Sequence, residues 1–297
     1  FAHQVNQLKD IGLRRAHGTE AGFYGARAAV IGGCAGTSVV ETEQMLDRPA
    51  MGTMSHSFIL SYDSELDAFE KYVKYNPDNA TLLVDTYNTL EKGVPNAIKV
   101  FKKALAEGGI TGRYGIRIDS GDLAYFSIEA RKMLDEAGLY DAGIVASSDL
   151  DEHLIKDLKS QGAKINSWGV GTKLITAYDC PALGGVYKLS VISGKSKLKV
   201  SNDPEKITNP GYKKIFRIYG KSNGMALADL ITLEDETINE AEPLTIFHPV
   251  HTWKKRIIND YYIRELLVPV FIEGKCVYQS PTISEMQGVP HHMIGVA

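Results

Sequence analysis

Helical and strand-like hydrophobic patterns alternate along the first part of this chain. Apolar residues three or four positions apart, which would line one face of a helix, recur in four stretches: 66–73, 98–105, 128–137 and 154–158. Each is followed by a short apolar run that ends in polar residues and predicts a strand: 82–84, 114–118, 143–146 and 165–170. Glycines at 108–109, 138 and 162 follow three of the helical stretches, as is typical where helices end.

The same alternation continues upstream with less regularity. Polar turns are predicted at 36–38 and 52–53, with a short helical stretch at 44–46 between them. Strands that alternate with helices at this spacing predict a parallel sheet, either doubly wound or closed, and the number of units favours an α/β barrel. After about Leu183 the pattern changes to alternating runs at 187–192, 197–200 and 214–219, separated by Gly, Asn and Pro. We therefore expect a barrel domain over 11–185 and a strand-rich domain over 186–285.

Composition and charge exclude several classes of protein. The 297 residues are 44% hydrophobic and 23% charged, which is typical of a globular protein and excludes a disordered or low-complexity chain. The net charge of −3 provides no basic field for nucleic acid or for an anionic membrane surface. No apolar run approaches the roughly 18 residues of a membrane span. The three cysteines have no metal-binding spacing and favour a reducing compartment, so we expect a cytoplasmic protein.

The candidate chemistry lies where the predicted strands end, because ligands of barrels and open α/β sheets bind at the carboxyl ends of the strands. The segment Gly169-Val170-Gly171-Thr172-Lys173 follows a strand and is typical of a turn whose backbone amides and hydroxyl hold a phosphate. Alone it is equally typical of a tight glycine turn. Ser147-Ser148, at the neighbouring strand end, favours the phosphate interpretation because hydroxyls from two loops would converge.

Arg117 and Asp119 lie on the same face of one predicted strand, since side chains alternate with a period of two. The pair is as consistent with a salt bridge inside the barrel as with substrate binding. Asp85 and Asp122 are further carboxylates nearby, so a diphosphate with its Mg²⁺ fits this region.

Histidines offer a weaker signal. His56, in the segment Gly52-Thr53-Met54-Ser55-His56-Ser57, follows a predicted strand end, although a single histidine is more often a packing or surface residue. His248 and His251 form an HxxH without a third ligand, so a packing role is expected there rather than a metal site. The chain has no GxxxxGK[ST] loop and no GxGxxG that opens a helix, which excludes P-loop use of ATP.

Taken in order, the motifs resemble those of the nicotinate phosphoribosyltransferase family, one of the type II phosphoribosyltransferases. The segments that carry the resemblance are 12–16, 36–38, 52–57, 84–87, 117–122, 168–174 and 247–251, within residues 11 to 285. The resemblance implies an irregular TIM-like α/β barrel joined to an open α/β sandwich, usually as a homodimer with the active site at the subunit interface. It also implies that part of the sandwich, including an aromatic residue that stacks on the substrate from the partner subunit, has no counterpart before Ile11.

The implied reaction joins nicotinate to the C1 atom of 5-phosphoribosyl 1-diphosphate, releases diphosphate, and is coupled to ATP hydrolysis through a phosphohistidine. The substrates are nicotinate, phosphoribosyl diphosphate and ATP, with Mg²⁺ carried on the diphosphate groups. The resemblance assigns phosphorylation to His56 and places Asp119 near the ribose or the pyridine nitrogen. It assigns nicotinate binding to Arg14, Ser38, Thr53 and Arg117, and binding of phosphoribosyl diphosphate to Ser147, Ser148, Gly169, Gly171 and Thr172.

Three alternatives remain open at this point. One is a barrel that binds ligands without catalysis, which release of diphosphate with nicotinate would exclude; the other two are enzymes. A nicotinamide phosphoribosyltransferase shares the barrel, but that relative carries an acid where this chain has Ser38. A barrel lyase or isomerase acting on a sugar phosphate would use the same phosphate turns together with a Schiff-base lysine or a poised glutamate, and Lys173 is the lysine expected near a strand end.

Overall fold

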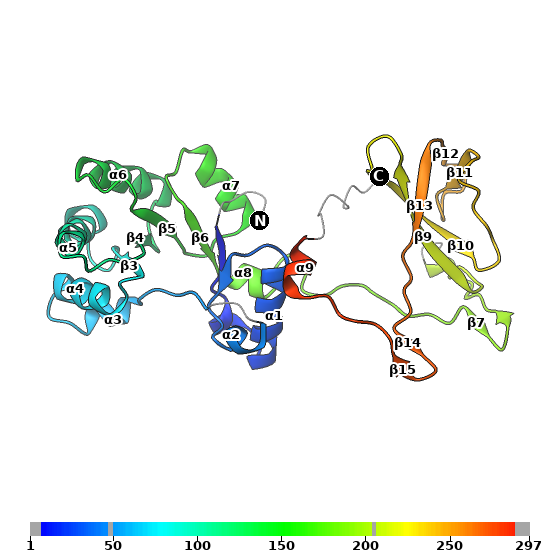
Figure 1. Ribbon diagram of the computed structural model, residues 1–297, viewed down its shortest axis with the longest axis horizontal. Coiled ribbons are helices and arrows are strands. Elements are labelled where there is room, and N and C mark those ends of the chain that lie inside the picture. The colour runs from blue at the N-terminus through cyan, green and yellow to red at the C-terminus, as the bar shows by residue number, and fades with distance from the viewer. Residues whose placement is uncertain (1–6, 47–49, 204–205, 289–297) are drawn as a thin grey trace. The chain divides into compact units, whose positions relative to one another are not determined.

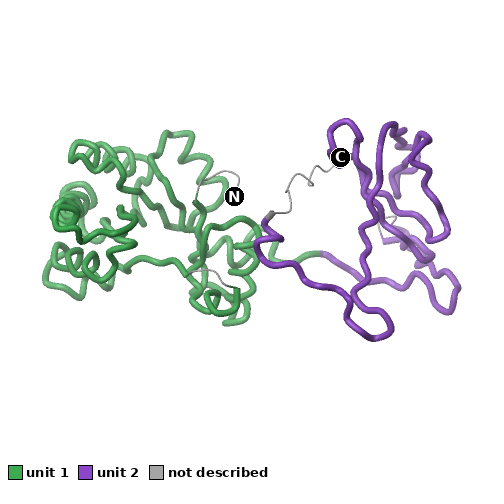
Figure 2. Tube along the Cα trace, viewed as in Figure 1, with its two compact units in different colours: residues 1–183 green, residues 184–297 purple. Residues whose placement is uncertain are grey.

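The computed structural model describes residues 7–46, 50–203 and 206–288, and its backbone divides into two compact units, 1–183 and 184–297 (Figures 1 and 2). Each unit is described by itself below. No helix among the described residues is long and apolar enough to cross a membrane.

The first unit is built on a six-stranded sheet in the order β2-β1-β6-β5-β4-β3, in which all neighbouring strands run parallel. Its strands are β1 (Leu8–Asp10), β2 (Gly36–Thr37), β3 (Asn79–Leu83), β4 (Arg113–Ile118), β5 (Gly143–Ala146) and β6 (Ser167–Val170). Because all of the strands run parallel, their carboxyl ends meet at one edge of the sheet.

Helices connect these strands and pack on them, with α4 on β3, α5 on β4, and α6 on β4 and β5 (Figure 1). The helices are α1 (Thr19–Ile31), α2 (Glu41–Leu46), α3 (His56–Leu60), α4 (Glu65–Tyr75), α5 (Val94–Ala106), α6 (Leu123–Glu136), α7 (Glu152–Ser160) and α8 (Thr172–Ile175). A 3-10 turn, η2 (Leu13–Arg15), follows β1, and a π-helical turn, η3 (Thr89–Gly93), precedes α5.

The local signals in the sequence explain where these helices begin and end. Ser64 and Asp151 accept hydrogen bonds from backbone amides of the first turns of α4 and α7, at 3.1 and 2.8 Å, as N-cap residues do. Gly138 and Gly162 follow α6 and α7 with φ of 80° and 82°, a conformation that favours glycine. Between the caps, one face of each helix is apolar and buried, as Phe101 of α5 illustrates.

The predicted alternation of helices and strands is therefore confirmed, and the barrel is confirmed in part. Among the described residues, β2 and β3 are the edges of the sheet, and a single parallel bridge from Thr37 to Ala50 extends it beyond β2. The polar turn predicted at 36–38 is wrong in its first two residues. Gly36 and Thr37 form a strand because β1 offers them a parallel partner that the sequence pattern did not reveal.

The second unit is strand-rich, as predicted. A three-stranded antiparallel sheet in the order β10-β9-β13 is its largest element, and short hairpins accompany it. The strands are β7 (Val191–Ile192), β8 (Lys195–Ser196), β9 (Lys213–Gly220), β10 (Ala226–Leu233), β11 (Leu244–Phe247), β12 (Lys255–Ile258), β13 (Tyr261–Glu265), β14 (Phe271–Ile272) and β15 (Lys275–Cys276), with a terminal helix α9 (Ile283–Gly288). The run at 197–200, expected to be extended, is not a strand, because the β7–β8 hairpin uses only two residues on each side.

Candidate active site

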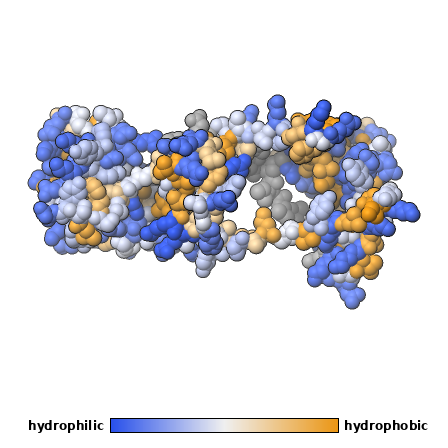
Figure 3. All heavy atoms as spheres, turned by 90° about the horizontal axis from the view of Figure 1, so that it is seen from below, coloured by the Kyte–Doolittle hydropathy of each residue, from blue (hydrophilic) through white to orange (hydrophobic). Residues whose placement is uncertain are grey.

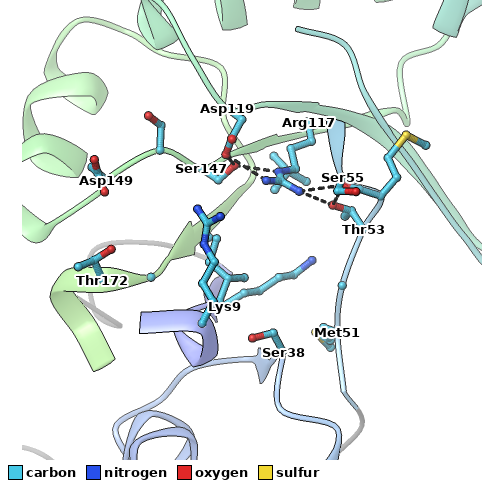
Figure 4. A pocket seen from close by; sticks show the side chains of 18 of the residues that line it. Lys9, Ser38, Met51, Thr53, Ser55, Arg117, Asp119, Ser147, Asp149 and Thr172 are labelled. Atoms are coloured by element: carbon cyan, nitrogen blue, oxygen red, sulfur yellow. Dashed lines mark hydrogen bonds and ion pairs between the residues drawn. The ribbon is translucent and has the colours of Figure 1, made fainter. Parts of the chain in front are cut away.

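A pocket of about 460 Å³ lies at the carboxyl ends of the parallel strands (Figure 4). The site residues that the family resemblance assigns all line it: Arg14, Ser38, Thr53, His56, Arg117, Asp119, Ser147, Ser148, Gly169, Gly171 and Thr172. These residues follow five different strands or lie in the segment 51–56. The prediction that strand-end residues lie together is thus supported by the geometry of the pocket.

Arg117 on β4 is the centre of the hydrogen-bond network in this pocket. Its Nε donates to Ser147 Oγ at 2.8 Å, and its Nη1 donates to Thr53 Oγ1 at 2.7 Å and to the Met54 carbonyl at 3.2 Å. Its Nη2 forms an ion pair with Asp119 Oδ1 at 3.0 Å, and Ser147 Oγ also donates to that oxygen. The planar guanidinium therefore ties the segment 53–54 to the ends of β4 and β5, and a lysine could not reproduce these directions.

Asp85 is buried and is hydrogen-bonded to two residues that line the pocket, His56 and Asp119. Its side chain is 1% exposed, and it accepts hydrogen bonds from the Asp119 amide at 3.0 Å and from the Ser120 hydroxyl. His56, at the start of α3, places its Nε2 3.0 Å from Asp85 Oδ1. A carboxylate only accepts, so Nε2 carries the proton in this bond, and in the neutral imidazole the lone pair is then on Nδ1.

The backbone after β5 adopts a conformation that is rare for residues other than glycine. Ser148 and Asp149 have φ of 102° and 34°, and both line the pocket. Such residues cost roughly 1–3 kcal/mol each and concentrate at ligand-binding sites. On the same side of the pocket as Asp149, Gly171 separates β6 from α8, and Thr172 lines the pocket there (Figure 4).

A second buried carboxylate shapes the other side of the pocket. Asp10 accepts from the Gly12 amide at 2.9 Å and from the Thr37 hydroxyl at 2.8 Å, which fixes the turns that carry Arg14 and Ser38. The Oγ atom of Ser38 is buried and has no hydrogen-bond partner among the described residues. A buried hydroxyl without a partner is costly and is available to a ligand.

Lys9 is a pocket residue that sequence reasoning missed. Its burial, with the positive charge of Arg113 nearby, lowers the pKa of this lysine. The signal was weak because β1 has only three residues and no apolar run. Alternation with Asp10, which faces the opposite side of the strand, was the available clue.

Two other sequence candidates of the first unit, Asp122 and Lys173, do not line the pocket. Asp122 caps α6 by accepting from the Tyr125 amide at 3.0 Å. Lys173 forms an ion pair with Asp151 at 2.8 Å, which raises the pKa of the lysine. His248 and His251 stack on each other in an exposed turn. His248 Nδ1 accepts hydrogen bonds there from the backbone amides of Val250 and His251. No cluster of three or more potential metal ligands occurs among the residues that the structure describes.

Comparisons with known proteins agree with the motif analysis. Residues 212–292 match the family described as the nicotinate phosphoribosyltransferase C-terminal domain. The chain is 49% identical to the nicotinate phosphoribosyltransferase of Bacillus subtilis (strain 168), over 94% of this chain and 57% of that protein. It is 35% identical to the Caenorhabditis elegans protein of the same name, over 95% of this chain and 59% of that protein.

A solved structure extends the agreement to the fold. The crystal structure of human nicotinic acid phosphoribosyltransferase superposes with a TM-score of 0.76 at 26% identity, covering 94% of this chain and 62% of the human chain. The chain thus spans less than two thirds of the length of these relatives. The family resemblance predicted from the motifs is confirmed.

Proposed function

The chain belongs to the nicotinate phosphoribosyltransferase family, and from this premise we propose that it transfers the phosphoribosyl group of 5-phosphoribosyl 1-diphosphate to nicotinate. The products are nicotinate mononucleotide and diphosphate, in NAD biosynthesis or salvage. The pyridine nitrogen supplies the electron pair of the new bond to C1, and the C1–O bond breaks so that its electrons leave with diphosphate.

The observation that carries this proposal is that the residues assigned by the family resemblance line one pocket, in which Arg117 bonds to Ser147 and Thr53. The transition state of such a transfer resembles an oxocarbenium ion, so the protein must aim the nucleophile and stabilise the leaving charge. We assign Ser147, Ser148, Gly169, Gly171 and Thr172 to phosphoribosyl diphosphate. We assign Arg14, Ser38, Thr53 and Arg117 to nicotinate, and Asp119 to the ribose or the ring nitrogen.

We further propose that ATP phosphorylates His56. In the neutral imidazole, the hydrogen bond to Asp85 holds the ring with its proton on Nε2 and its lone pair on Nδ1, as a nucleophile requires. Attack of Nδ1 on the γ-phosphorus would form a P–N bond and break the bond to the β-phosphate oxygen, with ADP as the leaving group. The side chain is 40% exposed, which leaves it accessible from the pocket.

Mg²⁺ fits this site as an ion carried by the diphosphate. Asp149 lines the pocket, is exposed, and is the carboxylate there that is not engaged by Arg117. Mg²⁺ typically uses one or two carboxylates together with phosphates and water. We propose that Asp149 meets the ion through a coordinated water or directly.

The finer architecture is also a proposal. We propose that the segment beginning at Ala50 closes the barrel between β2 and β3, supported by the Thr37–Ala50 bridge and by the bonds of Arg117 to Thr53 and Met54. We propose that the barrel domain spans 11–185 and the sandwich domain 186–285. We also propose that the protein is a homodimer whose second subunit completes the site, and that it is cytoplasmic. The three cysteines are all free, which supports a reducing compartment.

The competing functions have less support. A sugar-phosphate lyase needs a lysine with a depressed pKa as its Schiff-base residue, whereas Lys173 is paired with Asp151 and its pKa is raised. A carboxylate at position 38 would favour the amide over the acid, and Ser38 carries no negative charge.

The full-length protein incubated with phosphoribosyl diphosphate and either nicotinate or nicotinamide tests the main proposal. Release of diphosphate together with nicotinate mononucleotide is expected, with nicotinate strongly preferred. Absence of product with nicotinate, in folded protein supplied with Mg²⁺ and ATP, would contradict the assignment.

The phosphohistidine proposal has its own test. We expect His56→Ala to lose stimulation by ATP while retaining a slow uncoupled transfer, because the other pocket contacts do not involve the imidazole. The measurement is acid-labile label from γ-labelled ATP. Label that persists in His56→Ala would place the phosphoryl group elsewhere.

A further inference from the structure

Lys9 occupies an unusual position in the parallel sheet. Its register partners are Gly36 on β2 and Gly169 on β6, and residues in register on neighbouring strands face the same side. A Cβ atom at Gly36 would lie 2.4 Å from Met51 Sδ, and one at Gly169 would lie 3.0 Å from Ile11 Cδ1. Lys9 is therefore the one long side chain at this level of β1, β2 and β6, with apolar side chains occupying the space beside it.

The charge of Lys9 is not compensated by any described residue. No ion pair or hydrogen bond joins its Nζ to another described residue, and the neighbouring cation Arg113, together with burial, lowers the pKa of Lys9. Asp10, the adjacent carboxylate, faces the other side of β1, and its two oxygens are bonded to Gly12 and Thr37. A half-buried ammonium without a counterion is costly, so this position is explained by an anion that enters with the ligand.

The direction of the side chain decides which anion this is. Figure 4 shows Lys9 extending across the pocket toward the side where Ser38, Met51 and Thr53 lie, while Asp149 and Thr172 lie on the other side. The turns proposed to hold phosphate are on that other side. Ser38 lies on the same side as the Lys9 ammonium. Its buried hydroxyl is a second polar group without a hydrogen-bond partner among the described residues.

We propose that Lys9 is a specificity-determining residue that meets the carboxylate of the pyridine substrate beside the Ser38 hydroxyl. The inference rests on the proposed function and deepens it, because a positive charge at this point distinguishes an acid from the corresponding neutral amide. An ammonium and a carboxylate that are both withdrawn from water form a strong, charge-assisted hydrogen bond.

The test is Lys9→Met in the full-length protein, with Lys9→Gln as a second variant. Lys164→Met is the matched control, because it removes the same charge from an exposed residue outside the pocket. We expect the KM for nicotinate to rise about 10–100-fold, the range for loss of a hydrogen bond to a charged group. The kcat should change little, since the interaction is made equally before and during the reaction. The KM for phosphoribosyl diphosphate and the kcat/KM for nicotinamide should stay within about 3-fold, and the control should match the wild type.

Binding of nicotinate measured by calorimetry without turnover separates this inference from the proposed function. Wild-type protein that binds nicotinate but forms no mononucleotide contradicts the function, and weaker binding by Lys9→Met would still support the role of the lysine. An unchanged nicotinate-to-nicotinamide ratio in both folded variants would overturn the inference. So would a raised KM for phosphoribosyl diphosphate alone, which would assign Lys9 to a phosphate. Trapping of a carbonyl compound on Lys9 by borohydride would also overturn it.

Discussion

The two units of the chain bury their apolar residues to different extents. In the first unit, strands β3 to β6 and the helices that pack on them form one continuous core that includes Phe69, Ile116 and Leu134. In the second, the buried cluster is limited to Ile218, Ile258 and Tyr261, with partly buried neighbours. Figure 3 shows apolar side chains reaching the surface in both units, and the exposed apolar residues of the second include Trp253 and Phe271.

The difference follows from the two kinds of sheet. Helices cover the strands of a parallel sheet, so the sequences of those strands are nearly continuous apolar runs. An antiparallel sheet can leave one face exposed to water. The candidate site belongs to the unit with the larger core. A rigid scaffold beneath the strand ends lets short loops hold polar groups at fixed distances.

The largest expected effect is on substrate choice within the first unit. In Ser38→Asp, the new carboxylate would face the carboxylate of nicotinate, and two like charges ~4 Å apart at an effective dielectric of ~20 repel by roughly 4 kcal/mol, about a thousandfold in affinity. The same group would accept a hydrogen bond from the amide of nicotinamide. The measurement is kcat/KM for both bases in the wild type and the variant. An unchanged ratio would show that Ser38 does not contact the base.

Each unit contains an arginine–aspartate ion pair, and the two pairs can be compared by the same substitution. Arg117 and Asp119 lie in the pocket, while Arg217 and Asp229 join β9 and β10 of the second unit, with Nε–Oδ1 and Nη2–Oδ2 distances of 2.7 and 2.9 Å. Both arginines donate from a planar fork. Only the first connects loops that line the pocket.

We therefore expect Arg117→Lys to lower kcat/KM with nicotinate by about 100-fold or more, because an ammonium cannot reach Thr53, Ser147 and Asp119 together. The matched substitution Arg217→Lys should leave kcat/KM within about 2-fold of the wild type. Thermal unfolding of both variants controls for folding. Equal kinetics in the two variants would make the Arg117 network purely structural.

Truncation of one core isoleucine in each unit compares the cores directly. Ile116 on β4 is fully buried, and Ile263 on β13 is a partly buried neighbour of the smaller cluster. Ile116→Ala should lower the local free energy of unfolding by about 3 kcal/mol and Ile263→Ala by about 1 kcal/mol, because the cost grows with the cavity that remains. Hydrogen exchange of the amides of each sheet measures the two separately. A larger loss in the second unit would reverse the comparison.

The same contrast explains what could be predicted from the sequence. The helices and strand ends of residues 1–183 can be predicted because each helix has its own apolar period and its own terminating residues. Phe101 on the buried face of α5 and Gly138 after α6 are examples. The positions of Arg117 and Thr172 in one pocket followed from the rule that parallel strands end together. The sequence pattern does not predict Lys9 as a pocket residue or β2 as a strand, because β1 and β2 are too short to show a period. The hydrogen bond from His56 to Asp85 joins residues far apart in sequence, which no local pattern predicts.

The last expected effect concerns the thiols and depends on pH. Cys34 is buried in the first unit, and burial, together with Asp10, raises its pKa to about 12, whereas Cys180 and Cys276 are exposed. An unfolded thiol loses its proton near pH 8.5. Between that pH and about 12 the folded state therefore binds more protons than the unfolded state, and stability falls as the pH rises. The loss attributable to Cys34 is at most about 2 kcal/mol between pH 8.5 and 10. Urea unfolding at these two pH values measures it: Cys34→Ala should flatten the decline and Cys180→Ala should not, whereas an equal decline in all three proteins would show that Cys34 does not titrate differently in the folded state.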